Sequence, residues 1–535
     1  MTQSTGQSPL PSLDETLEHL RQVERRYTEE LRIEATRAVI EANERFVTDR
    51  RRVETYLGHL GSKNMFLDMY GLGNCPNSLP LALPRYLMEI MEASSRVLNA
   101  LTRRNLLAGG PGYLLERMPK GWLTEEMAAR LHDHFLTHEP DMGFDVLVYG
   151  KHSHRGMTFE EFKRTGDWLD AKILEAQSVD TYYGWVREYL VGARRAGLGD
   201  QCRFTWSTDP GGRLLTDAEL DREVYGTLTY GFEAEREAIL FLEIEPEKQA
   251  TYQNLVFMAD LVSRGEPQHR PVILDPSDLE LRSDRLYVTR PGQERKIKKV
   301  ISRIVDVDLQ AYLHARTAAG DQATIERFKR IYALPHLFTD LSKHLCGFYL
   351  VDKSSLTDMS LLGEVSIAPH TELVTPEHVE RCRRQPELLK RIAIKPLHGM
   401  SAKGVVVQPT LAQLEQAVAR EQMLAQETIW ATPVQPNLNT EIDDPDVQAG
   451  ICSEARLVLQ AGNPAVAHNP HRSRLIAGLT RSHFQSRDPE RRIKDDPRGR
   501  GWYSNVGAIM AVRKELGIER KNDAGVGMAP IYCLN

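Results

Sequence analysis

Strand-like runs alternate with helical periodicity between residues 230 and 309, and this alternation constrains the fold more than any other feature. A strand-like run at 238–244 is followed by a helix through Leu255, Met258 and Val262, and then by strand-like runs at 271–275 and 298–306. Strand, helix, strand, short hairpin and strand is the pattern of a parallel α/β unit with crossover helices on the sheet. We therefore predict an α/β fold.

The N-terminal segment has a different pattern. Apolar residues recur every three or four positions from Leu13 to about Leu57, with Glu and Arg dense between them, and Gly58 and Gly61 offer stop signals. The spacing predicts a continuous amphipathic helix. A helical layer packed on the body is the first interpretation, and a helix pair at a homodimer interface is the alternative.

Length and charge limit the class of protein. A chain of 535 residues exceeds what one hydrophobic core normally serves, so we expect two or three domains. The net charge of −6 gives no reason to expect nucleic-acid or anionic-membrane partners, and no run approaches the roughly 18 apolar residues of a membrane span. The six cysteines are dispersed, which predicts reduced thiols rather than a disulfide framework. We expect a cytoplasmic protein.

The C-terminal third holds the clearest chemical signal. A strand-like run, IAIKP, ends in Lys395, and the turn that follows contains Gly399, Ser401 and Gly404 before the next strand. Glycines let backbone N–H groups approach phosphate oxygens closely, and a lysine adds a point charge beside them. The P-loop and dinucleotide fingerprints are both absent. The segment therefore predicts nucleotide binding of another kind.

Two further segments fit a nucleotide site. Residues 424–429 read as an edge strand that passes into a linker, where exposed backbone groups could pair with an adenine edge. Glu454 begins a later strand and is placed to hold ribose hydroxyls, although a structural salt bridge is an equal alternative. Lys353 lies at the start of a helical stretch upstream.

These residues together resemble the ATP-grasp enzymes, in particular the circularly permuted branch that includes eukaryotic-type glutathione synthetase and glutathionylspermidine synthetase. Five landmarks follow the order of that branch: a strand ending in Arg303, Lys353 at a helix start, Lys395 in the Lys-Pro strand, the hinge strand LAQETI, and the Ser-Glu strand with Glu454 followed by a Gly-rich segment at 504–512. The resemblance covers about residue 250 to the end, with one short stretch near 203–212.

The resemblance implies an ATP-grasp fold with a Rossmann-like substrate-binding subdomain and a helical N-terminal extension. The expected divisions are the extension at 1–62, a helical or mixed region at 63–245 that contributes part of the permuted core, the parallel α/β subdomain with a linker at 246–375, and the nucleotide-binding region at 376–535. Bound ATP and Mg²⁺ would follow from the same resemblance.

The resemblance also assigns roles to individual residues. Lys353 and Lys395 would hold the nucleotide phosphates, and Arg303 would face the reacting carboxylate or its acyl phosphate. Glu454 would contact the ribose. The Gly-rich loop over the γ-phosphate and the adenine-reading backbone would be supplied by Gly399, Ser401, Gly404, Gln426, Glu427 and Ile429.

A basic segment at 471–500 stands out in an acidic chain. It contains nine Lys and Arg residues against four Asp and Glu residues. This composition favours a mobile loop that closes on anionic ligands, with Arg474 or Arg481 able to clamp a substrate carboxylate. A solvated charged loop is the competing interpretation.

The metal site is where the resemblance departs from the branch. The branch has Glu-x-Asn and then a Gly pair on a strand of the N-terminal half, and the matching stretch here, 204–212, keeps the Gly pair but has Thr and Ser in place of Glu and Asn. Asp209 is the nearest replacement as a Mg²⁺ ligand, and Asn505 is another oxygen donor. Two interpretations remain: the carboxylates lie elsewhere in the sequence, or phosphoryl chemistry is altered or lost.

The sequence thus leads to two functional hypotheses. The first is an ATP-dependent, ADP-forming ligase that joins a small-molecule carboxylate to an amine through an acyl phosphate. The second is a degenerate ATP-grasp scaffold that binds nucleotide or a protein partner without catalysis.

Overall fold

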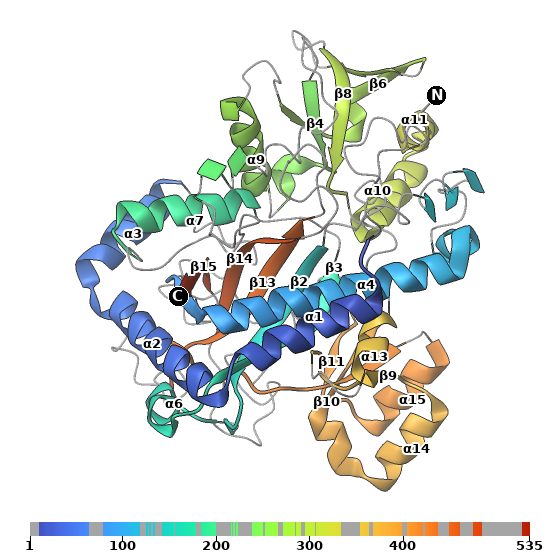
Figure 1. The fold of residues 1–535 in the computed structure, drawn as a ribbon. Coiled ribbons are helices and arrows are strands. Elements are labelled where there is room, and N and C mark those ends of the chain that lie inside the picture. Colours follow the sequence, from blue (N-terminus) through green and yellow to red (C-terminus); the bar gives the residue numbers. More distant parts are fainter. Residues whose placement is uncertain are drawn as a thin grey trace.

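The computed structural model shows three β-sheets with helices packed around them (Figure 1). The structure describes residues 10–63, 79–117, 125–126, 128–129, 132–133, 142–154, 156–177, 183–198, 216, 218–219, 221–222, 238–249, 252–265, 271–283, 285–289, 295–304, 306–332, 354–362, 367–397, 404–420, 423–436, 449–460, 474–483 and 527–534.

Three helices, not one, form the N-terminal layer: α1 (Leu13–Arg26), α2 (Glu29–Thr48) and α3 (Arg50–Ser62). The breaks fall at residues that cap new helices, because the side chains of Thr28 and Asp49 accept hydrogen bonds from the backbone N–H groups three positions ahead. Ser12 and Glu15 form a capping box at the start of α1. The prediction of one continuous helix is therefore wrong, although its helical character is confirmed.

A long helix, α4 (Arg85–Arg117), lies beside α1 across the front of the largest sheet (Figure 1). The GGPG sequence at 109–112 contains the turn-forming residues Gly and Pro, yet it forms a kink inside this helix rather than ending it. Gly110 has a φ of 62° there, a left-handed conformation that glycine adopts without steric cost. The strand β1 (Leu81–Pro84) precedes α4, and Asn43 of α2 bonds both the N–H and the C=O of Ala82.

The largest sheet has six strands in the order β1-β15-β14-β13-β2-β3. Strands β1 and β15 are parallel and the other pairs are antiparallel. The run at 144–150, predicted as a strand, is confirmed within β2. Besides β1, its strands are β2 (Met142–Gly150), β3 (Leu169–Gln177), β13 (Cys452–Gln460), β14 (Arg474–His483) and β15 (Gly527–Leu534).

Strand β14 corrects one prediction. The basic segment at 471–500 was expected to be a mobile loop, but residues 474–483 form a strand between β13 and β15. Its apolar residues explain this, since Leu475, Ile476 and Leu479 supply the β-branched and aliphatic content that a strand inside a sheet requires.

The five-stranded sheet, in the order β5-β4-β8-β7-β6, confirms the predicted α/β unit. Strand β4 is parallel to β5 and β8, and β6, β7 and β8 form antiparallel hairpins. Its strands are β4 (Ala238–Leu242), β5 (Val272–Leu274), β6 (Leu279–Arg282), β7 (Arg285–Val288) and β8 (Arg295–Ser302). Its helices are α9 (Tyr252–Gly265), α10 (Asp306–Ala318) and α11 (Gln322–Tyr332), with short 3₁₀ turns at Pro246–Lys248 and Pro276–Asp278.

The four-stranded sheet, in the order β11-β10-β12-β9, is antiparallel throughout. Its strands are β9 (Thr371–Leu373), β10 (Ile392–Pro396), β11 (Val406–Val407) and β12 (Met423–Glu427). The helices α14 (Pro376–Arg384) and α15 (Leu411–Arg420) and a 3₁₀ segment (Pro386–Arg391) lie with it. The strands β10, β11 and β12 were predicted from the sequence.

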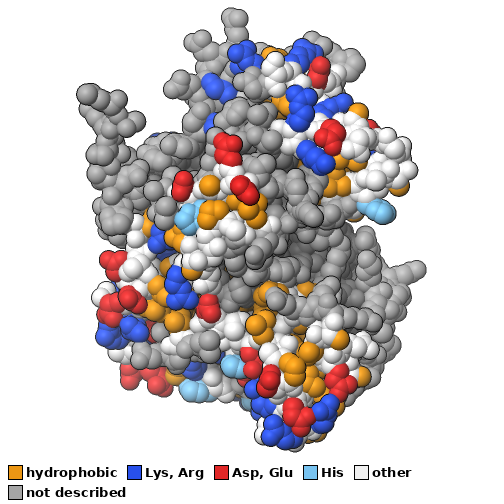
Figure 2. All heavy atoms as spheres, turned by 90° about the vertical axis from the view of Figure 1, so that its right-hand side faces the viewer, with side chains coloured by type: hydrophobic (Ala, Val, Ile, Leu, Met, Phe, Trp, Pro, Cys, Tyr) orange, Lys and Arg blue, Asp and Glu red, His pale blue; other side chains and the backbone are white. Residues whose placement is uncertain are grey.

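The remaining described helices are α6 (Phe159–Thr165), α7 (Tyr183–Arg195) and α13 (Ser354–Leu361). Acidic and basic side chains lie side by side on the lower part of the face in Figure 2, over α14 and α15. Arg383 of α14 pairs there with Glu380 of the same helix and with Glu415 of α15. Within the described residues, no helix combines the length and the apolar character that crossing a bilayer requires.

Candidate functional site

At β2 and β13, one face of the six-stranded sheet is apolar and the other, called the polar face here, carries charged residues beside the apolar Leu147 and Cys452. On the apolar face, every second residue of β2 and β13 belongs to the hydrophobic core that also contains residues of α1, α2 and α4; examples are Val146, Val148 and Ala455. Residues between them point the other way, because successive side chains of a strand alternate faces. Register places Asp145 opposite both Arg456 and Glu175, so these charged residues share the polar face.

Charges on this polar face are buried. Arg456 donates from two guanidinium nitrogens to the two carboxylate oxygens of Asp145, and their side chains are 7% and 1% exposed. Glu454, two residues before Arg456 on the same face, is 0% exposed. Burying charge is costly unless it is paired, and such groups are concentrated at functional sites. This face is therefore the first candidate for a ligand site.

The four-stranded sheet meets this region through Lys395 and Gln426. Lys395 Nζ donates to the backbone carbonyl of Leu174 at 2.9 Å, and Gln426 Nε2 donates to the same oxygen at 3.2 Å. Both side chains lie on one face of their sheet, since Gln426 is opposite Ala393, two residues before Lys395. Lys395 is only 7% exposed. A lysine and an amide from one sheet thus converge on one atom of the other.

A β-bulge in β3 makes the Leu174 carbonyl available. Val146 is opposite Ile173 and Asp145 is opposite Glu175, so Leu174 is an extra residue with no partner across the ladder. The bulge lies immediately before Glu175, whose carboxylate is half-buried and makes no hydrogen bond or ion pair in the described part of the chain.

Glu175 was not predicted as a site residue from the sequence. Its strand reads Glu175-Ala-Gln177 and is followed after a short gap by Tyr183-Gly184 at the start of α7. This is a Glu-x-amide signal of the kind sought at 204–212, and it lies about 30 residues before that stretch. Lys172 lies on the same strand, and burial lowers the pKa of its ammonium, while the carboxylate of Glu427 opposes that shift.

The chain that leaves β12 closes an apolar corner beside this contact. Leu147, Leu174, Ala431 and Cys452 form a small buried cluster, and Ile429 packs against it. The backbone N–H of Glu427 donates to the backbone carbonyl of His370 at 2.8 Å, and that of Thr428 donates to the backbone carbonyl of Arg391 at 2.8 Å. Among the described residues, the Ile429 N–H makes no hydrogen bond. The backbone N–H groups of Glu427 and Thr428 are therefore already used within the fold, whereas that of Ile429 is not used by the described residues.

Arg303 lies at the carboxyl end of the parallel strands of the other sheet. It follows β8, its N–H donates to the Leu242 carbonyl at 2.9 Å, and its guanidinium donates to Glu243 at 3.0 Å. The Glu243 side chain is 1% exposed and that of Arg303 is 14% exposed. The carboxyl edge of parallel strands is a common ligand position. Arg303 is therefore held in place by a buried carboxylate rather than lying free on the surface.

Gly404 is constrained by its neighbour in β10. Its φ of +77° is left-handed, and a Cβ added there would lie 2.7 Å from Pro396 Cγ. Arg474 and Arg481 both lie in β14, where Arg481 is opposite Glu454 in the register. The other predicted site residues lie outside the described residues: Lys353, Gly399, Ser401, Asp209 and Asn505.

Within the described ranges, no group of three or more His, Cys, Asp or Glu side chains forms a preassembled metal cluster. Magnesium does not require one, because it is usually held by one or two carboxylates together with phosphate oxygens and water. Glu175 offers one such carboxylate: it is half-buried and follows Leu174, whose carbonyl accepts the hydrogen bond from Lys395.

The architecture is that of a mixed α/β chain in which a small antiparallel sheet contacts the polar face region of a larger one. No protein-family model matches the chain, and no curated protein matches it. Among solved structures it is similar to a glutathione synthetase like-effector from Globodera pallida in its apo form, at 13% identity and a TM-score of 0.42, over 82% of this chain and 96% of that one. At this level of likeness, neither an activity nor a ligand is transferred to the chain.

Proposed function

We propose that the chain is an ATP-dependent ligase of the ATP-grasp type, which joins a carboxylate to an amine with release of ADP and phosphate. The observation that carries the proposal is the convergence of Lys395 Nζ and Gln426 Nε2 on the Leu174 carbonyl, directly beside Glu175. The buried Lys395 ammonium donates to a backbone carbonyl, and a phosphate oxygen in that position could accept the same hydrogen bond.

The nucleotide would lie between the two sheets. The apolar corner formed by Leu147, Cys452 and Ala431 suits an adenine ring, and the Ile429 N–H offers a donor for its edge. Lys395 would then exchange the Leu174 carbonyl for phosphate oxygens, which bind an ammonium more strongly because they are charged. Glu454, buried on the same face, is the residue proposed for the ribose hydroxyls.

Glu175 would hold Mg²⁺ against the phosphates, with Asp209 and Asn505 as further proposed ligands. The ion, when bound, supplies charge neutralisation that lets an anionic nucleophile approach phosphorus. The chain's own contribution is positioning: Lys395 fixes the phosphates, and Arg303, oriented by Glu243, would bind the substrate carboxylate and the acyl phosphate formed from it. An amine would then attack the acyl carbon: the C–N bond forms, phosphate leaves with the C–O bond pair, and the proton released by the nitrogen passes to the leaving phosphate or to water.

One observation favours the alternative of a scaffold that binds nucleotide without catalysis. Arg303 is already engaged by the buried carboxylate of Glu243, so its charge is partly neutralised before any substrate arrives. In a scaffold this pair is structural. The two functions differ in one measurement, because a scaffold binds ATP without magnesium-dependent ADP release.

The experiment is amine-dependent ADP release with a panel of amino acids as acids and amines. We expect Lys395→Ala to abolish turnover while circular dichroism stays unchanged. Lys390→Ala, which removes an exposed lysine in the 3₁₀ segment before β10, is the matched control and should retain turnover. Unchanged turnover in Lys395→Ala contradicts the proposed role of Lys395.

A further inference from the structure

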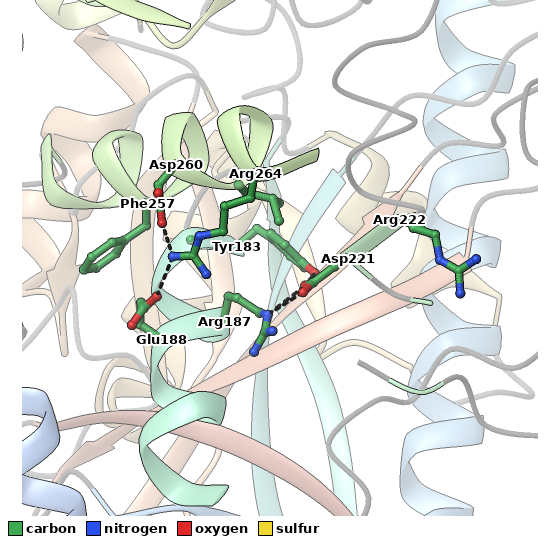
Figure 3. A pocket seen from close by; sticks show the side chains of 10 residues that line it. Tyr183, Arg187, Glu188, Asp221, Arg222, Phe257, Asp260 and Arg264 are labelled. Atoms are coloured by element: carbon green, nitrogen blue, oxygen red, sulfur yellow. Dashed lines mark hydrogen bonds and ion pairs between the residues drawn. The ribbon is translucent and has the colours of Figure 1, made fainter. Parts of the chain in front are cut away.

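A cavity of about 280 Å³ lies between α7 and α9, on elements other than those that carry Lys395 and Gln426. Figure 3 shows Tyr183, Arg187 and Glu188 reaching it from α7, and Phe257, Asp260 and Arg264 from α9. Its volume lies near the lower end of small-molecule pockets, which run from roughly 300 to 1,000 Å³. It is large enough for a ligand the size of an amino acid.

The close approach of the two helices shapes this cavity. A Cβ added at Gly184 would lie 2.6 Å from the Asn254 backbone oxygen and 2.8 Å from Phe257 Cβ, so only glycine fits there. The Asn254 side chain accepts from the Trp185 N–H at 3.1 Å and ties the start of α7 to α9. The cavity walls are therefore fixed before any ligand arrives.

Arg187 is held in the position of a ligand-binding arginine. Its Nε donates to both carboxylate oxygens of Asp221, at 2.7 and 2.8 Å, and the Tyr183 hydroxyl donates to the same carboxylate at 3.2 Å. In the described part of the chain, the two terminal nitrogens of Arg187 make no hydrogen bond. One side of the guanidinium is thus anchored, and the paired N–H groups on the other side remain for a ligand.

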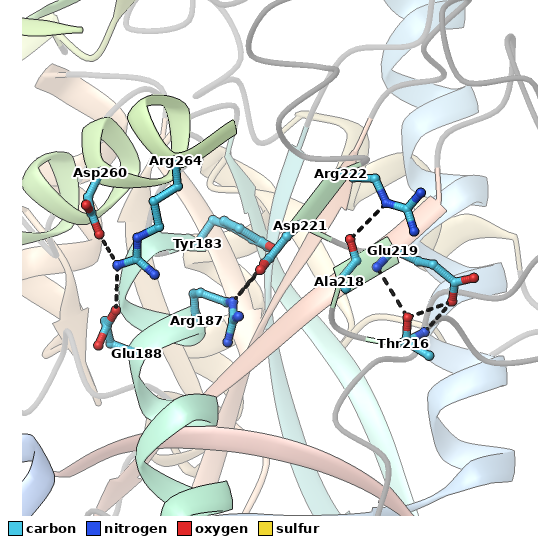
Figure 4. A network of polar contacts seen from close by, with 10 residues as sticks. All are labelled: Tyr183, Arg187, Glu188, Thr216, Ala218, Glu219, Asp221, Arg222, Asp260 and Arg264. Carbon is cyan, nitrogen blue, oxygen red and sulfur yellow. Dashed lines mark hydrogen bonds and ion pairs between the residues drawn. The ribbon is translucent and has the colours of Figure 1, made fainter. Parts of the chain in front are cut away.

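The segment that supplies Asp221 is itself fastened. Thr216 and Glu219 form a reciprocal capping pair, in which the Thr216 N–H and hydroxyl donate to the Glu219 carboxylate and the Glu219 N–H donates to the Thr216 oxygen (Figure 4). Asp221 follows two residues later and faces Arg187. The residue that anchors Arg187 therefore lies two positions after a capping pair.

The charged side chains that line the cavity are equal in number, but Arg222 and the terminal nitrogens of Arg187 have no carboxylate partner among the described residues. Arg264 donates a hydrogen bond to the Asp260 carboxylate, and its Nη2 lies 4.0 Å from Glu188 Oε1. The other oxygen of Glu188, Oε2, lies 3.9 Å from Lys63 Nζ. Arg222 at the rim has no carboxylate partner among the described residues. The lining contains three cations, Arg187, Arg222 and Arg264, and three carboxylates, Glu188, Asp221 and Asp260; Lys63 lies outside it. Phe257, Leu261 and the ring of Tyr183 supply the apolar wall.

We propose that this cavity binds a small carboxylic acid with an apolar body, whose carboxylate is held by the terminal nitrogens of Arg187. The guanidinium fork matches a carboxylate in geometry and charge, and the apolar wall removes the rest of the ligand from water. The site is independent of nucleotide binding, so the test uses no ATP and its outcome does not depend on the ligase proposal.

The test is calorimetric titration of the full chain with benzoate and with benzamide, which have nearly the same shape but differ in charge. We expect benzoate to bind and benzamide to bind at least tenfold more weakly, because only benzoate pairs with the guanidinium. Arg187→Gln should weaken benzoate about tenfold or more, and Arg187→Lys should recover only part of that loss, because lysine lacks the fork. Arg194→Gln, on the exposed side of α7, is the control and should bind like the unmodified chain.

A second variant separates binding from folding. Leu261→Trp fills the cavity while every charged residue stays in place, and we expect it to abolish benzoate binding with the helical circular dichroism intact. Equal binding of benzamide and benzoate overturns the proposal. Undiminished benzoate binding in Arg187→Gln or in Leu261→Trp overturns it as well, as does the absence of benzoate binding to the unmodified chain.

Discussion

The buried pair between Asp145 and Arg456 gives the sharpest stability prediction. The variant Asp145→Ala removes the carboxylate that bonds two guanidinium nitrogens of Arg456, whose side chain is 7% exposed. Breaking a buried ion pair by removing one partner costs about 3–5 kcal/mol, because the remaining charge stays out of water. We therefore expect the free energy of unfolding to fall by about this amount in equilibrium urea titrations followed by circular dichroism and tryptophan fluorescence.

Two further variants make that result interpretable. Arg383→Ala removes a surface arginine that is 51% exposed and pairs with Glu380 and Glu415, and it should cost no more than about 1 kcal/mol. The double variant Asp145→Leu with Arg456→Met leaves no charge at this position and should recover most of the loss. If Asp145→Ala costs no more than Arg383→Ala, the inference that this face buries an ion pair on which stability depends is wrong.

Three other predictions concern separate parts of the chain. Burial lowers the pKa of His59 below 6.5, so the unfolded chain binds more protons at this residue than the folded chain does. The contribution of His59 to the free energy of unfolding is therefore complete above pH 6.5 and falls as the pH decreases below that value. In urea unfolding at decreasing pH, His59→Gln should make this decline less steep. Gly184→Ala should lower the free energy of unfolding by about 1–3 kcal/mol through overpacking, whereas Gly58→Ala, with no atom near the added methyl, should not destabilise. Glu175→Gln should raise the Mg²⁺ concentration needed for ADP release about tenfold, with the exposed Glu160→Gln unchanged, and an identical metal titration for both would remove Glu175 from the site.

Apolar periodicity predicted most of the elements that pack a core. The strands β4, β8, β10 and β12 carry Val, Ile and Leu in short runs bounded by turn residues, so their strand character is visible in the sequence. The breaks after Tyr27 and at Asp49 were not predicted, because the hydrophobic stripe continues across them and only the caps mark the ends. Gly110 kinks α4 instead of ending it, since one left-handed residue redirects a helix when packing on both sides continues.

The site was only partly predictable. Lys395 and Gln426 were identified from their own strands, but their meeting point on Leu174 lies more than 200 positions away in sequence and depends on a bulge that no periodicity reveals. Glu175 was not predicted because the acidic metal ligands were sought at 204–212, although the alternation of apolar residues with Asp170 and Lys172 is itself typical of a strand. The Arg187 site depends on two helices and a capped turn that only tertiary structure brings together.

The central claim is that the contact between the two sheets at Lys395 is a triphosphate site. Its most direct test is calorimetric titration with a non-hydrolysable ATP analogue in the presence of Mg²⁺, for the unmodified chain, Lys395→Ala and Lys390→Ala. We expect the analogue to bind the unmodified chain and Lys390→Ala equally and to bind Lys395→Ala about tenfold or more weakly, as loss of one charge-assisted phosphate contact requires. Equal affinity for all three proteins, or no binding to the unmodified chain, would contradict the claim.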